Sequence, residues 1–218
     1  VLPETVVGLC LHYWKEEDDE DDDWHRSLHS RRVDFGIDED RMALRYFPPG
    51  ASQTPTFTLL VTNEKVGVDF IIRLMNECVE LYAQSVPQEY ITKVDIKDED
   101  GIKNWQWHSP ALWGMYRGMD TSPYTLQSVH MALEKYLLNM SKDGKYEQCE
   151  QIMKLLLFEC HSSSVSAVVA SLVLAYPEKY WRLALILFRT IEFIETDNQR
   201  ALSERTMNSF YGIGNTLN

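Results

Sequence analysis

Apolar residues recur at spacings of three and four along most of the chain, a period typical of helices with one buried face. The clearest segment is 66–85, where a single stripe holds Val68, Ile71, Ile72, Met75, Cys78, Val79 and Tyr82. The same period covers residues 5–14, 55–63, 111–117, 125–140, 146–160, 164–176 and 178–196. The pattern predicts a mostly α-helical protein.

Three prolines follow a hydroxyl residue at the start of a predicted helix. The pairs are Thr54–Pro55, Ser109–Pro110 and Ser122–Pro123. A hydroxyl oxygen accepts a bond from an unpaired N–H of the first turn, and proline suits the first helical position because it has no N–H. We therefore expect these three hydroxyl residues to cap their helices.

The period changes between residues 90 and 107. Here YITKVDI and IKNWQW alternate around KDEDG, and Asp-Gly is the strongest short signal for a hairpin. We predict one β-hairpin at about 90–107. Its first arm should bring Ile91, Val94 and Ile96 close to Trp105 and Trp107 of the second. A hairpin is marginally stable alone, so it must pack on neighbouring helices.

The last third of the chain has short connections between helices, which makes consecutive helices antiparallel neighbours. A small-residue segment, SSSVSAVVASLVLAY, precedes the bulkier EKYWRLALILFRTIEFIE. Paired-helix repeats such as HEAT and armadillo have this composition. We expect an antiparallel helical-hairpin, solenoid-like array with the β-hairpin inserted. Because there is no strict internal period, a non-repetitive helical domain is the alternative.

The chain divides into two parts. Residues 1–45 hold the end of a helix and an acidic linker, and residues 46–218 form the helical domain with its hairpin. The first residues already carry apolar periodicity without an initial Met, and the last residues, YGIGNTLN, carry no helix stop. We therefore expect a piece of a longer protein.

The net charge is −12, and eight consecutive acids at 16–23 carry most of it. Such a surface repels phosphate backbones, which argues against nucleic-acid binding. No apolar run reaches the roughly 18 residues that cross a bilayer, and no signal peptide is recognisable, so no membrane association is expected. The four cysteines have no regular spacing, which predicts reduced thiols in a cytoplasm.

Neither a nucleotide nor a metal is expected as a cofactor. The sequence has no GxxxxGK[ST] and no GxGxxG motif. One set of metal-ligand types exists, made of Cys10, His12, His25 and His29. Only its second pair has a spacing seen in zinc sites, and the intervening carboxylates favour weak, unspecific binding of divalent cations. We therefore predict no metal site.

Nucleophilic catalysis needs a serine or cysteine beside a base. The right residue types are supplied by His108, Ser109, Asp120 and His130, which define a hydrolase-like enzyme as the alternative function. No GxSxG elbow frames a serine. His130 shares a helical face with Leu126, Leu133 and Leu137, so a core histidine is expected there. We predict no catalytic residue.

Aromatic residues are dense around and after the hairpin. Tryptophan and tyrosine anchor protein interfaces. Exposed together, these residues would form an interaction surface of Trp105, Trp107, Trp113, Tyr116, Arg117, Asp120 and Tyr124. The alternative, which the pattern favours, is that the hairpin tryptophans pack onto the following helices.

Three phrases carry a resemblance: YFPPGASQTPTFTLL, ALWGMYRGMDTSPYTLQSVHMALEKYLL and SSVSAVVASLVLAYPEKYWRLALILFR. Together they resemble segments of the long helical region of very large bacterial ATPases of the STAND class, which serve in antiphage defence. The resemblance spans residues 46–189, most of the chain. It implies a cytoplasmic, non-catalytic scaffold or sensor that contacts a protein ligand or neighbouring domains. Walker, nuclease and protease motifs are absent here, so no catalytic residue is carried over.

Overall fold

The computed structural model describes residues 2–15, 34–38, 46–101, 103–119 and 122–214, with side chains up to residue 204. This part of the chain contains nine α-helices, two 3₁₀ turns and one two-stranded antiparallel sheet. The first half comprises α1 (Pro3–Trp14), α4 (Thr56–Thr62), α5 (Glu64–Ser85), η1 (Gln88–Tyr90), β1 (Thr92–Lys97) and β2 (Lys103–His108). The second half comprises α6 (Pro110–Gly114), η2 (Met115–Arg117), α7 (Tyr124–Lys142), α8 (Tyr146–Glu159), α9 (Ser163–Ala175), α10 (Trp181–Phe188) and α11 (Ile191–Gly214). The predictions of a mostly helical protein and of one hairpin are confirmed.

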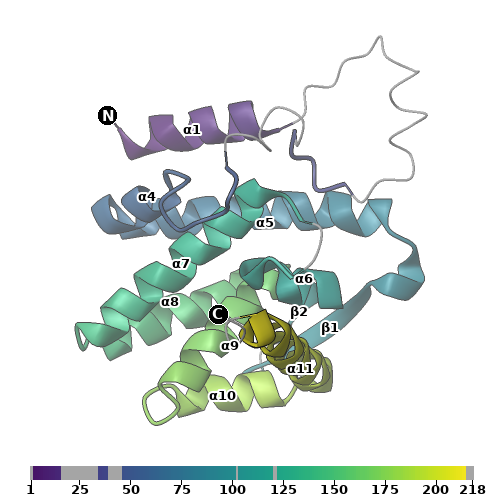
Figure 1. Ribbon diagram of the computed structural model, residues 1–218. Coiled ribbons are helices and arrows are strands. Elements are labelled where there is room, and N and C mark those ends of the chain that lie inside the picture. The colour runs from purple at the N-terminus through teal and green to yellow at the C-terminus, as the bar shows by residue number, and fades with distance from the viewer. Residues whose placement is uncertain (1, 16–33, 39–45, 102, 120–121, 215–218) are drawn as a thin grey trace, which may run out of the picture.

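The helices lie in layers (Figure 1), with α1, α4 and α5 on one side and α10 at the opposite edge. Helix α7 packs against α4, α8 and α9, and α9 packs against α6, α8, α10 and β2. The neighbours of α9 thus include elements that are distant along the chain. In a solenoid each repeat contacts only the next. The contacts of α9 therefore do not confirm the solenoid-like order, which stays a prediction.

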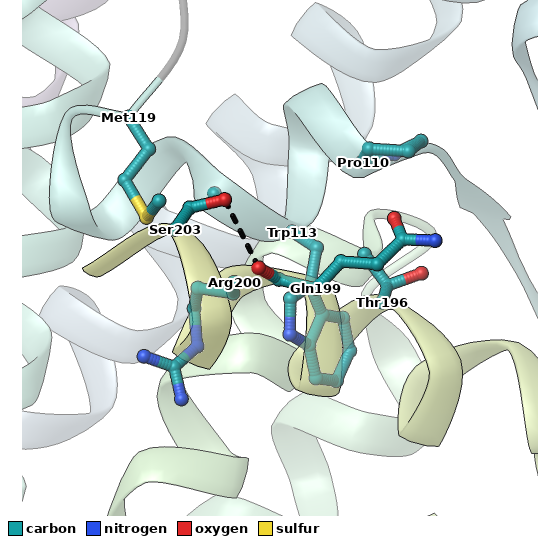
Figure 2. A pocket seen from close by; sticks show the side chains of 8 residues that line it. Pro110, Trp113, Met119, Thr196, Gln199, Arg200 and Ser203 are labelled. Atoms are coloured by element: carbon teal, nitrogen blue, oxygen red, sulfur yellow. Dashed lines mark hydrogen bonds between the residues drawn. The ribbon is translucent and has the colours of Figure 1, made fainter. Parts of the chain in front are cut away.

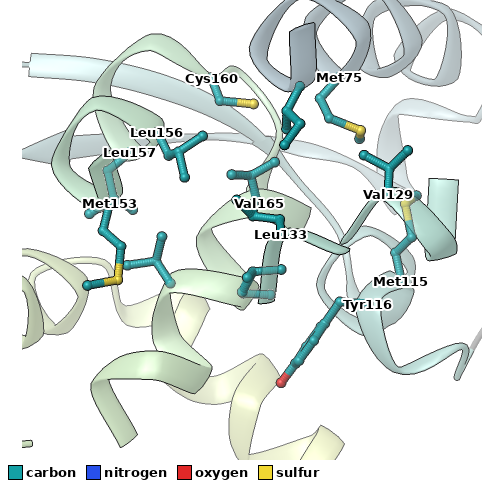
Figure 3. Packing of buried hydrophobic residues seen from close by; sticks show 14 of the residues in the cluster. Met75, Met115, Tyr116, Val129, Leu133, Met153, Leu156, Leu157, Cys160 and Val165 are labelled. Atoms are coloured by element: carbon teal, nitrogen blue, oxygen red, sulfur yellow. The ribbon is translucent and has the colours of Figure 1, made fainter. Parts of the chain in front are cut away.

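Helix α9 is the most buried helix because its residues are small. Its first seven residues, SSVSAVV, are all buried, and Val165 and Val168 have no exposed surface. Figure 3 shows Val165 beside Leu133 of α7, surrounded by side chains of α5, α7, α8 and η2. Helices can approach α9 from several sides because serine, alanine and valine fill little volume. The predicted close packing of the small-residue helix is therefore observed.

The hairpin faces differ from the prediction. Its register pairs Val94 with Gln106 and Lys93 with Trp107. Directly opposed residues share one face of a sheet, so Gln106 points into the core with Val94, whereas Trp107 lies on the other face. The expectation that Val94 and Ile96 meet the tryptophans is wrong. Register is set by the turn, and the last pair before it is Lys97 with Lys103, which is wider than a two-residue Asp-Gly loop would allow.

The helix predicted at 178–196 is broken between α10 and α11 at Arg189 and Thr190. The hydroxyl of Thr190 donates to the Asp95 carbonyl oxygen at 3.2 Å, and the guanidinium of Arg189 donates to the carbonyl oxygen of Asp98. These bonds satisfy carbonyls at the end of β1. The period of apolar residues does not encode them, so a continuous helix was the wrong prediction.

One of the three predicted caps is confirmed. The hydroxyl oxygen of Ser109 accepts from Leu112 N at 3.1 Å. The helices after Thr54 and Ser122 have proline as the N-cap residue and no side-chain cap. The Thr54 hydroxyl bonds Thr56, and Ser122 accepts from the Gln127 amide at 3.2 Å, so both prefer other partners.

Helix α1 belongs to the same hydrophobic core as the later helices. Trp14 is buried, donates to the Tyr46 hydroxyl at 3.1 Å and contacts the ring of Phe70. The acidic run at 16–23, with His25 and His29, lies outside the described residues. The boundary predicted at residue 45 and the cation binding of the acidic run stay predictions. Among the described helices, none has the length and apolarity to cross a membrane.

Enlarging a buried residue of α9 should destabilise the protein. Ala167 is 1% exposed, so Ala167→Leu forces side chains apart and should lower the free energy of unfolding by about 1–3 kcal/mol. Ala175, at the exposed end of the same helix, provides the control. Urea unfolding should show Ala175→Leu within about 0.5 kcal/mol of the parent. Equal losses for both variants would contradict the packing described for α9.

Candidate functional site

The residues of the hydrolase hypothesis are dispersed among different partners. Asp120 lies outside the described residues. The Ser109 hydroxyl lies 3.1 Å from the Tyr82 hydroxyl and caps α6. His108 and His130 instead contact serines of α9, Ser163 and Ser164, which the sequence analysis did not single out.

His108, at the end of β2, connects three elements. Its Nδ1 lies 3.1 Å from the hydroxyl of Ser163, and its Nε2 lies 3.0 Å from the hydroxyl of Thr196 on α11. The Thr196 hydroxyl also donates to the Glu192 carbonyl oxygen at 2.8 Å. Since a hydroxyl has one hydrogen, Thr196 accepts from His108 Nε2–H, and Nδ1 accepts from Ser163.

His130 adopts the opposite tautomer in α7. Its Nδ1 lies 2.7 Å from the Leu126 carbonyl oxygen, which can only accept, so Nδ1 carries the hydrogen. Its Nε2, 2.9 Å from the Ser164 hydroxyl, therefore accepts the Ser164 hydrogen. Ser162 completes the relay because its hydroxyl lies 2.7 Å from that of Ser164.

Four fully buried serines, which we call the serine layer, organise these contacts: Ser162, Ser163, Ser164 and Ser166. Ser166 donates to Gln106 Oε1 at 2.6 Å, and Gln106 Nε2 donates to the Leu157 carbonyl oxygen at 2.9 Å. Among the described residues, every buried side-chain nitrogen and oxygen has a partner. The sequence signal was the run SSSxS at the start of an otherwise apolar helix.

Burial sets the protonation of both histidines. It lowers the pKa of His108 to about 4 and that of His130 to about 4. Both rings are therefore neutral at pH 7, and each accepts from a serine. Burial likewise raises the pKa of Cys160 to about 12, so this residue is a packing thiol, and all four cysteines are free and buried. Through the bonds of Ser163 to His108 and of Ser164 to His130, the serine layer joins α9 to β2 and α7. The bond of His108 to Thr196 adds α11.

Acid should destabilise the protein through these rings. Each histidine has a pKa near 6.5 when unfolded and about 4 when folded, so the unfolded state binds more protons between these values. Stability is complete above pH 6.5 and falls by roughly 3 kcal/mol per ring as the pH drops to 4. His130→Gln should remove up to about 1.4 kcal/mol per pH unit of this slope, measured by urea unfolding between pH 5 and 6.5.

The matched control is His12→Gln, because His12 is exposed on α1. The slope of His130→Gln should lie below that of this control. An unchanged slope in His130→Gln would mean that the ring binds its proton equally in the folded and unfolded states, which would contradict the lowered pKa.

The predicted aromatic surface divides into separate places. Trp113 and Tyr116 are 1% and 2% exposed and belong to the core. Trp105 and Trp107 are half-buried on the outer face of the hairpin, where the Lys93 ammonium lies 4.0 and 4.5 Å from their ring centroids. Tyr124 is exposed and packs on Phe47 instead.

Arg117 belongs to a chain of charges that joins η2 and α7 to α11. Its guanidinium lies 3.1 Å from Glu134 and 3.8 Å from Glu204. Glu204 also pairs with Arg200 at 2.7 Å, and Arg200 pairs with Asp197 at 2.8 Å. The Trp113 indole donates to Asp197 at 3.1 Å, so the chain of charges ends in the core.

A pocket of about 170 Å³ adjoins this chain of charges, between α6 and α11 (Figure 2). Met119, Trp113 and Gln199 lie around it, and the Ser203 hydroxyl donates to the Gln199 carbonyl oxygen at 3.0 Å. The Arg200 guanidinium is bound by its two carboxylates. The pocket is small, and its arginine is neutralised.

Helix α10 has two apolar faces, which the sequence analysis missed. Leu183, Ile186 and Leu187 are buried in the core. The opposite side, which we call the outer α10 face, consists of Trp181, Leu185 and Phe188, exposed by 52%, 44% and 63%. The signal was WRLALILF, in which only Arg182 is polar, because a helix that is apolar on nearly every side is normally covered on every side.

A groove of about 190 Å³ lies beside Phe188, between α9, α10 and α11. We call it the α9–α11 groove. Its mostly apolar lining includes Ala170, Leu174, Ala184, Phe188, Ile194 and Asn198. Leu174 in this lining is 61% exposed, and Ile191, three residues before Ile194 on α11, is 58% exposed. Apolar surface thus gathers along α10 and its neighbours.

Neither a protein-family profile nor a curated protein matches this chain.

Proposed function

We propose that the chain is a non-catalytic helical scaffold that binds a protein through the outer α10 face. The observation that carries this proposal is the second apolar face of α10. An isolated exposed leucine needs no explanation, but exposed Trp181, Leu185 and Phe188 share one side of an eight-residue helix. Contiguous apolar patches of this kind are typical of protein-interaction sites.

The size of the patch supports binding. A tryptophan or phenylalanine buries about 150–250 Å² when covered, so the exposed halves of Trp181 and Phe188 offer roughly 200 Å². At about 25 cal/mol per Å², covering them yields about 5 kcal/mol before the cost of association. Aromatic anchors of this kind dominate binding energy in interfaces.

Helix α10 lies at the edge of the helical layers (Figure 1), where a solenoid-like array would add its next repeat. Helical arrays need a polar outer face on their last repeat. An apolar edge instead favours a further helical layer, supplied by a protein ligand or by a neighbouring domain. In this proposal, the scaffold acts as a sensor when a ligand or a neighbouring domain binds and covers the outer α10 face.

The resemblance to the helical region of STAND ATPases extends this proposal to a bacterial, cytoplasmic parent protein in antiphage defence. Its support is the three quoted phrases, the last of which contains α9 and α10. Sequencing the parent reading frame tests it. A Walker A motif upstream is expected, whereas a start codon directly before Val1 and a stop after Asn218 would contradict it.

The hydrolase alternative has two supporting contacts, that of His130 with Ser164 at 2.9 Å and that of His108 with Ser163 at 3.1 Å. His130→Ala separates the two functions. For a scaffold, the variant loses stability, about 1–3 kcal/mol for the orphaned polar groups, and has unchanged partner binding. Loss of hydrolysis of a generic activated ester, with folding intact by circular dichroism, would favour the enzyme.

The outer α10 face should contact the partner directly. With photoreactive benzoylphenylalanine in place of Leu185, cross-linking in cells should capture a protein that the same residue at Val61 does not capture. Val61 is similarly exposed, at 61%, but lies on α4. The captured protein, once purified, should bind Leu185→Glu at least about tenfold more weakly than the parent chain.

The control for binding is Val61→Glu, which should retain the parent affinity. Equal binding by both glutamate variants would show that the partner does not use α10.

A further inference from the structure

We propose that the α9–α11 groove binds a basic amphipathic helix of a partner protein. This inference rests on the proposed function and names the kind of partner. The shape of the groove, the charges at its rim and the charge of the whole chain support it independently.

The groove has helical walls on both sides. On α11, the lining residues Ile194 and Asn198 are four positions apart, so they share one face of the helix. On the opposite side lie Leu174 of α9 and Phe188 of α10. A groove between helices takes a further helix by its apolar stripe, with anchors at i, i+3, i+4 and i+7.

The rim on the α11 side is acidic. Glu195 is exposed and directly follows the lining residue Ile194 on α11, so it lies beside the groove and outside its lining. Among the described residues it has no ion pair within 4.0 Å. Glu192, one turn earlier, is half-buried. Asp197 also lines the groove, but it is paired with Arg200.

The nearby cations are occupied elsewhere. Arg189 donates to the carbonyl oxygens of the hairpin end. The guanidinium of Arg182 lies 5.4 Å from the Trp181 ring centroid, and the ammonium of Lys179 lies 5.0 Å from that of Tyr146. Glu195 is therefore available to pair with a lysine or arginine beside the apolar stripe of a partner helix.

The net charge of the chain is −12, with eight acids at residues 16–23, and it favours a basic partner over an acidic one. A chain of this charge attracts a basic segment over long distances and repels a second copy of itself, an anionic lipid surface and a nucleic acid. Among helical occupants, the basic amphipathic class complements both the apolar lining and the acidic rim.

The test uses two synthetic helices of about 14 residues, identical in their leucine stripe and carrying either lysine or glutamate elsewhere. Titration calorimetry should show the lysine peptide binding about tenfold or more tightly than the glutamate peptide. Leu174→Lys should lower the affinity for the lysine peptide about tenfold. Glu195→Lys should reduce the ratio of the affinities for the two peptides. Val61→Lys, equally exposed on α4, should change neither affinity.

Equal affinity of the parent chain for both peptides would overturn the inference. Unchanged binding of the lysine peptide to both groove variants would also overturn it, because the peptide would then bind other acidic residues. Self-association of the chain in sedimentation, abolished by Leu174→Lys, would make a second copy the occupant and also overturn it. If a partner is cross-linked from position 185 but the two peptides bind with equal affinity, the proposed binding through the outer α10 face stands. Only the proposed preference of the α9–α11 groove for a basic helix is then wrong.

Discussion

Pairing of the polar groups at the buried start of α9 fixes the arrangement of the surrounding elements. The serine layer has no contact with solvent, so each hydroxyl must find a partner inside the protein. Ser163 bonds His108 of β2, Ser164 bonds His130 of α7, and Ser166 bonds Gln106 of β2. A slip of one residue would turn the serines by about 100° around the α9 axis and leave several of these groups unpaired.

The same constraint explains why α10 carries an uncovered face. His108 bonds Thr196 of α11, and Thr190 bonds a carbonyl of β1, so the start of α11 is attached to the hairpin. The chain therefore turns at residues 189–190 instead of continuing α10. Helix α11 then closes on α6 through the pair of Trp113 with Asp197, which leaves the outer α10 face without a neighbour in the described structure.

The spacing of apolar residues predicted the features that depend on nearby positions in the sequence. The stripe of 66–85, the hairpin and the buried position of His130 were all expected from spacing alone. The break at Thr190 was not, because its bond reaches a residue 95 positions away. Likewise, the composition of IKNWQW favours tryptophan over Gln106 for the core, and only the register reverses this choice. The outer α10 face escaped prediction because apolar residues were assumed to be covered.

Helix α10 buries one apolar face and leaves the other exposed, and the proposed binding role depends on this exposure. Hydroxyl-radical footprinting of the chain, read by mass spectrometry, measures the solvent access of each side chain on this helix. The structure predicts strong oxidation of Trp181, Leu185 and Phe188 and protection of Leu183, Ile186 and Leu187. Adding the partner should protect the first three. Equal protection of both sets in the unbound chain would contradict the account.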